Sequence, residues 1–87
     1  MALDKKLLKR LKALYVEDDD NIRNELASLL GNFFDTVFTA ADGEEGLALF
    51  NAHKDEIDVV LSDINMPKMT GIEMVKEIRK IDTKVPV

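Results

Sequence analysis

The sequence predicts an α/β fold in which helices alternate with the strands of a parallel sheet. Short apolar runs, rich in β-branched residues, recur along the chain and are separated by segments with helical periodicity. Strands that alternate with helices form right-handed βαβ units, and such units build a parallel sheet. Two of the apolar runs end directly in acidic residues, so the sequence also predicts acids at the carboxyl edge of that sheet.

The first part of the chain is predicted to hold a lead-in, a strand and a helix. Residues 3–10 form a short basic helical segment, so that residues 1–10 lead into the domain, and residues 11–16 form the first strand. Asp20 is expected to cap the helix that follows, and Gly31 to end it. The apolar positions of this helix are Ile22, Leu26, Leu29 and Leu30.

The remainder of the chain repeats this alternation. Residues 36–39 form the second strand, and Asp42 caps the second helix. Residues 57–61 form the third strand, residues 70–80 form the third helix, and residues 84–87 begin another β-like run. The apolar positions are Leu47, Leu49 and Phe50 in the second helix, and Ile72, Met74, Val75 and Ile78 in the third.

Composition excludes several classes of protein. The 87 residues suffice for one small domain, which spans residues 1–87. The net charge of −5 argues against non-specific binding to nucleic acid. No apolar run approaches the roughly 18 residues that a membrane-spanning helix needs. The sequence contains no cysteine, which excludes disulfides and fits a cytoplasmic location. The lone His53 is expected to be a solvated surface residue.

Three carboxylates are predicted to meet at one edge of the sheet. Glu17 and Asp18 directly follow the first strand, and Asp63 follows the third. Ligands of open α/β sheets bind outside the carboxyl ends of the strands, so these side chains converge if the two strands are neighbours. Carboxylates that crowd together repel one another, and Mg²⁺ relieves this by taking oxygen ligands. Asp18 and Asp19 are the alternative pair, but Glu17 and Asp18 follow the strand more directly.

These motifs together resemble the receiver domain of bacterial two-component response regulators. The acid pair after the first strand, Asp63 after the third, and the Asn65-Met66-Pro67 segment that follows carry the resemblance. The Met69-Thr70-Gly71 segment and the Val-Pro-Val start of a fourth strand also fit, although Thr70 stands where an acidic residue is common. The resemblance extends over residues 11–87. It implies a flavodoxin-like (CheY-like) fold with helices on both faces, strand order 2-1-3, and a fourth strand beside the third.

The resemblance also implies a function. Asp63 would accept a phosphoryl group from a sensor histidine kinase, a phosphotransfer protein or a small phosphodonor. Mg²⁺, or Mn²⁺, would be held by Glu17, Asp18, Asp63 and the backbone carbonyl of Asn65. Such a domain promotes its own phosphorylation and is not a conventional enzyme. No direct contact with nucleic acid or membrane is expected.

The end of the chain departs from the family pattern. Receivers usually have five strands and five helices, whereas this sequence ends in the first residues of the fourth strand, so we expect a C-terminally incomplete domain. The Thr or Ser that ends the fourth strand and the Lys that ends the fifth are not among the 87 residues. An uncovered strand edge invites pairing, which predicts a homo-oligomer or a segment-swapped dimer. A binding-only or oligomerising module without a working phospho-switch is therefore the alternative function.

Overall fold

The strands that the sequence predicts form a parallel sheet. The computed structural model describes residues 5–62 and 69–87, and within these residues the strands are β1 (Lys12–Val16), β2 (Thr36–Ala40) and β3 (Val59–Ser62). Their order is β2-β1-β3, and both pairings are parallel. The predicted order 2-1-3 is therefore confirmed, and β1 lies at the centre of the described sheet.

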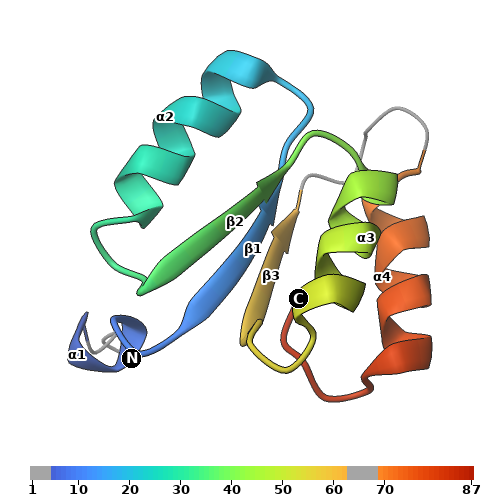
Figure 1. Cartoon of the computed structure of the whole chain (residues 1–87). Coiled ribbons are helices and arrows are strands. Elements are labelled where there is room, and N and C mark those ends of the chain that lie inside the picture. The colour runs from blue at the N-terminus through green and yellow to red at the C-terminus, as the bar shows by residue number, and fades with distance from the viewer. Residues whose placement is uncertain (1–4, 63–68) are drawn as a thin grey trace.

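Helices cover both faces of this sheet. They are α1 (Lys5–Leu8), α2 (Asp20–Leu30), α3 (Gly43–His53) and α4 (Gly71–Ile81). Figure 1 shows α2 on one face and the neighbouring helices α3 and α4 on the other. This arrangement confirms the flavodoxin-like architecture. Within the described residues, no helix combines the length and apolar character that crossing a membrane requires.

The core lies between the sheet and the layer formed by α3 and α4. Strand β1 is buried from Ala13 to Val16 because neighbouring strands and helices enclose it on all sides. The largest fully buried side chains come from β1, β3, α3 and α4: Leu14, Val16, Val60, Phe50, Met74 and Ile78. Burying side chains of this size is worth about 1.5–3 kcal/mol each, so this layer supplies most of the apolar stabilisation.

The helix caps correct one prediction and confirm another. Asp42 caps α3, as expected, and accepts a hydrogen bond from the Glu45 amide. The prediction that Asp20 caps α2 is wrong. Helix α2 begins at Asp20, so the preceding Asp19 has the extended backbone of a cap, and its Oδ1 accepts from the Ile22 amide at 3.0 Å.

The apolar face predicted for α2 does not enter a core. Ile22, Leu26 and Leu29 are all exposed, and no residue of α2 is buried, although the helix contacts β1 and β2. Figure 1 shows α2 without a second helix alongside it on that face, within the described part of the chain. A helix that packs alone on a sheet covers only the residues beneath it. On the opposite face, Ile72, one of the predicted apolar positions of α4, is likewise 54% exposed, whereas Met74 and Ile78 are buried.

The last residues lie beside β3, as predicted. Residues 84–87 are not assigned to a strand, but the Val60 amide of β3 donates to the Pro86 carbonyl at 2.9 Å. Val85 is buried in the core cluster. The segment therefore takes the first position of a fourth strand next to β3.

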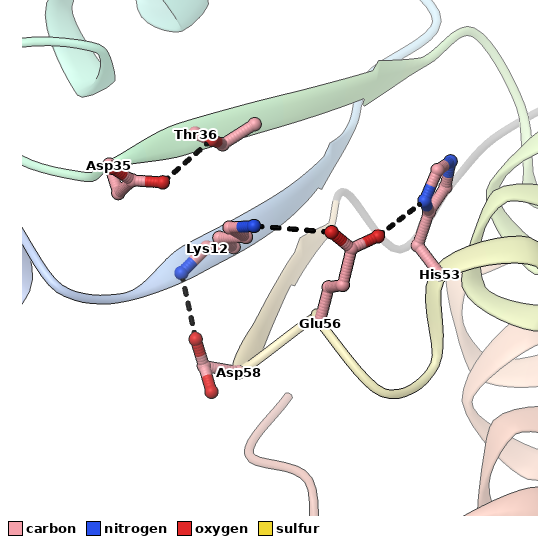
Figure 2. Close-up of polar contacts among 6 residues, drawn as sticks. All are labelled: Lys12, Asp35, Thr36, His53, Glu56 and Asp58. Carbon is pink, nitrogen blue, oxygen red and sulfur yellow. Dashed lines mark hydrogen bonds and ion pairs between the residues drawn. The ribbon is translucent and has the colours of Figure 1, made fainter.

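A cluster of charged side chains connects the amino end of the sheet, where β1 and β3 begin, to the end of α3. Glu56 contacts Lys12 Nζ at 3.1 Å through Oε1 and His53 Nδ1 at 2.8 Å through Oε2, as Figure 2 shows. The His53 ring also stacks on Phe38, with centroids 4.4 Å apart. His53 therefore lies at the surface, as predicted, with 34% of its side chain exposed, and it also packs against Phe38. The hydrogen bond from His53, followed by the contacts of Lys12, holds the pKa of Glu56 below its ordinary value.

Glu56→Gln is expected to reduce the loss of stability at acid pH. A carboxyl with a lowered folded-state pKa stabilises the fold above its ordinary value of 4.5, and this contribution disappears as the pH falls through the folded-state pKa. Urea denaturation between pH 3 and pH 7 should therefore show a shallower pH dependence for the variant. Glu25→Gln, on the exposed surface of α2, is the control for loss of one carboxyl. Equal changes in both variants would contradict the role of this cluster.

Gly43→Ala is expected to destabilise the fold by about 1–3 kcal/mol, the usual cost of overpacking. A Cβ at Gly43 would lie 2.3 Å from the Met69 carbonyl oxygen, so backbone would have to move. Gly31→Ala is the matched control, because its Cβ would meet nothing closer than 3.4 Å. The control should gain about 0.4–1 kcal/mol through the unfolded chain. Urea denaturation measures both, and a Gly43→Ala variant as stable as the parent would refute this reading.

Candidate functional site

The acidic turn that connects β1 to α2 (Glu17, Asp18 and Asp19) lies at the carboxyl edge of the sheet. Glu17, which is partly buried, and Asp18, which is exposed, follow β1 directly. Val16 at the end of β1 pairs with Ser62 at the end of β3, so these two strands end at the same edge of the sheet. Asp63 follows Ser62 in the sequence. Asp63 and Asn65, the other two predicted site residues, lie outside the described residues.

Hydrogen bonds hold Glu17 on three sides. Its amide donates to the Ala40 carbonyl at the end of β2, at 3.0 Å. Its own carbonyl accepts from Arg23 Nη1 at 2.9 Å, and its Oε1 accepts from the Asp19 amide at 3.2 Å. The position of this residue is therefore fixed by the sheet, by α2 and by the turn itself.

The two acids that follow Asp18 make contacts with α2. Asp19 Oδ1 accepts from the Ile22 amide and so caps the helix. Asp20, the first residue of α2, forms an ion pair with Arg23 at 2.5 Å. A negative charge at this end of a helix is favourable because the helix dipole is positive there. The run of four acids thus divides into a pair at the strand end and a pair that begins the helix.

The donor set at the strand end suits a hard divalent cation. Glu17 and Asp18 offer carboxylate oxygens, and Mg²⁺ typically binds through one or two carboxylates and completes its shell with water and phosphate. Among residues 5–62 and 69–87, no three or more His, Cys, Asp or Glu side chains are grouped to hold a metal. Within the described part of the chain, the strand end therefore offers the two carboxylates of Glu17 and Asp18.

A hollow of about 690 Å³ opens beside Glu17. Tyr15 and Ser62 line it on the sheet, and Ile72, Val75 and Lys76 line it on α4. Its walls are mostly apolar, with the acid Glu17 and the basic Lys76 as its charged members.

Sequence reasoning missed Arg23. This residue lies six positions after Glu17 and contacts its main-chain carbonyl. A basic residue one turn into a helix that begins with acids signals an ion pair within the helix, which does form with Asp20. The bond to the Glu17 carbonyl leaves no pattern in the sequence, because every residue has a carbonyl.

Comparisons with known proteins agree with this geometry. Residues 13–87 match the family described as the response regulator receiver domain. The probable transcriptional regulator ycf27 of Guillardia theta is 45% identical over 85 residues, which are 98% of this chain and 32% of that protein. The chain thus spans about a third of the length of this curated relative.

Solved structures show the same likeness. The N-terminal domain of a protein from Wolinella succinogenes matches with a TM-score of 0.79 and 44% identity, over 85% of this chain and 58% of that one. The CheX–CheY–BeF₃–Mg complex from Borrelia burgdorferi matches with a TM-score of 0.78 and 35% identity, over 85% of this chain and 56% of that one. With the family match covering most of its length, this chain belongs to the response regulator receiver domains of two-component systems.

Proposed function

We propose that this receiver domain accepts a phosphoryl group on Asp63, next to Mg²⁺, or Mn²⁺, held at the carboxyl edge of the sheet. The observation that carries the proposal is the pairing of Val16 with Ser62. This register supports a position for Asp63 beside Glu17 and Asp18, because adjacent parallel strands lie only about 4.8 Å apart.

Glu17, Asp18, Asp63 and the backbone carbonyl of Asn65 would hold the metal. Glu17 is favoured over Asp19 because the Asp19 carboxylate already caps α2. The complex of the Borrelia burgdorferi relative contains Mg²⁺ and BeF₃, an ion that imitates a phosphoryl group in size and charge, and this supports the same pairing here. When bound, Mg²⁺ supplies charge neutralisation for phosphoryl transfer.

The proposed step is an in-line displacement at phosphorus. A carboxylate oxygen of Asp63 forms the new P–O bond, while the bond from phosphorus to the donor breaks and the donor keeps that electron pair. The donor is the phosphohistidine of a sensor kinase or phosphotransfer protein, or a small acyl phosphate. The product is an acyl phosphate, whose hydrolysis restores Asp63. A receiver of this kind promotes its own phosphorylation and dephosphorylation, and is not a conventional enzyme.

The setting of this reaction follows from the family. Sensor histidine kinases and phosphotransfer proteins are the proposed partners, and the cytoplasm is the proposed location. The net charge of −5 opposes a direct contact between these 87 residues and nucleic acid or an anionic membrane. No observation favours the binding-only alternative.

Asp63→Asn should abolish phosphorylation while the fold persists. The substitution removes the nucleophile and one charge from a crowded acidic site. Intact-mass spectrometry after incubation with acetyl phosphate and Mg²⁺ should show one added phosphoryl group on the parent. The group should be absent from the variant, and from the parent when a chelator replaces Mg²⁺.

Asp58→Asn is the matched control for this experiment. Asp58 precedes the same strand at its opposite end, where its Oδ2 accepts from the Lys12 amide at 2.8 Å. The Asp58→Asn variant should therefore gain one phosphoryl group, as the parent does. Labelling of Asp63→Asn would show that the acceptor is another residue. An unlabelled parent that is folded by circular dichroism would contradict the phosphoacceptor proposal and support a binding-only module.

Self-association of two copies stays a prediction. Strand β3 is the last assigned strand of the described sheet, and Pro86 is bonded to it at Val60. The exposed side chains of Ile72 and Val87 line the hollow next to it. Light scattering over a concentration series should give a mass that rises toward that of a dimer. A monomer mass at every concentration would show that this edge does not pair.

A further inference from the structure

Arg23 joins the start of the acidic turn to the start of the helix. Its Nη1 donates to the Glu17 carbonyl at 2.9 Å, and its Nη2 pairs with Asp20 Oδ1. Only 17% of its side chain is exposed, whereas the carboxylate of Asp20 is 80% exposed. The guanidinium group is planar and presents its donors at fixed angles, so two such bonds fix the relative positions of the groups they join.

These bonds close the turn between β1 and α2. Glu17, Asp18 and Asp19 connect the end of the strand to the beginning of the helix. The Arg23 amide also donates to the Asp19 carbonyl, at 2.8 Å, as α2 begins. Arg23 therefore restrains the turn at both of its ends, and Asp18 lies between the restrained points.

The charge of Arg23 and its hydrogen bonds have opposite effects on the affinity of the proposed site for Mg²⁺. A positive charge beside carboxylates repels an incoming cation, so by charge alone Arg23 would weaken Mg²⁺ binding. A side chain that fixes the groups carrying the metal ligands strengthens binding, since less conformational freedom is lost when the metal arrives. The two effects predict opposite responses to removal of the guanidinium group, and a single affinity measurement separates them.

We propose that Arg23 is a positioning residue for the divalent cation, and that it acts by holding the main chain of Glu17 and Asp18. The proposal rests on the metal site proposed above. A purely structural ion pair at an exposed helix end would need only Asp20, and surface pairs of this kind contribute little. The bond to the Glu17 carbonyl goes to the residue whose carboxylate is a proposed ligand, which points to a role in shaping the site.

The test compares Mg²⁺ affinities by isothermal titration calorimetry with MgCl₂. Arg23→Met keeps the apolar stem and removes the guanidinium group, and its affinity should fall on the order of tenfold, as for other partners of metal-binding groups. Arg23→Lys keeps the charge without the planar fork and should recover part of the loss. Lys80→Met removes a cation from the exposed Lys80–Glu77 pair of α4, and should bind Mg²⁺ like the parent.

Each outcome decides the question. An affinity of Arg23→Met that equals or exceeds that of the parent would overturn the proposal, because removal of the guanidinium group would then not weaken Mg²⁺ binding. If circular dichroism shows that Arg23→Met is unfolded, Arg23→Lys decides, and parental affinity in that variant overturns the proposal. If the parent binds no Mg²⁺, both the proposed metal site and the proposed role of Arg23 are wrong. If the parent binds Mg²⁺ and the folded Arg23 variants bind it with the same affinity, only the proposed role of Arg23 is wrong.

Mg²⁺ protection against urea provides a second measurement that does not depend on phosphorylation. A ligand that binds only the folded state raises the free energy of unfolding by RT ln(1 + c/Kd), where c is the free ligand concentration, so a tighter ligand at the same concentration protects more. The parent and Lys80→Met should gain the same protection from a given MgCl₂ concentration, and Arg23→Met should gain less. Equal protection in all three proteins would contradict positioning by Arg23, because a merely structural role lowers stability equally with and without Mg²⁺.

Discussion

The parallel pairing of β1 with both of its neighbours is the constraint on which the rest of the structure depends. Val16 lies opposite Ala40 on one side and Ser62 on the other. The three strands therefore end at a common edge of the sheet. The buried side chains of β1 fix this register, because a shift by one residue would turn Leu14 and Val16 to the opposite face of the sheet.

The sequence was sufficient for the strand order and for the core of α4, but not for the details of the acidic run. Four consecutive acids offer several equivalent caps, and the choice of Asp19 depends on where α2 begins, which the sheet decides. Helical spacing identified an apolar face containing Ile22 and Leu29, yet spacing cannot show whether another element covers that face. Asp63 was predicted from its position after a strand, and its role stays a prediction.

At the carboxyl edge of the sheet, main-chain hydrogen bonds hold the acidic residues that follow β1 in place. Glu17 is bonded to β2 through its amide and to α2 through its carbonyl, and neither of these bonds uses its carboxylate. That carboxylate, with Asp18, can therefore respond to a cation without loss of the turn. Such a restraint could not be predicted from sequence, because a bond between a side chain and a distant main-chain carbonyl imposes no residue type at the acceptor.

The opposite ends of the sheet each carry a natural spectroscopic probe. The sequence has one tyrosine, one histidine and no tryptophan. Tyr15 lines the hollow beside Glu17, whereas His53 stacks on Phe38 and contacts Glu56 near the amino end. Tyrosine fluorescence can consequently follow events at the acidic edge, while the imidazole proton resonances follow the far end, in the unlabelled protein. Comparing the two signals during a titration would show how far a local change extends along the strands.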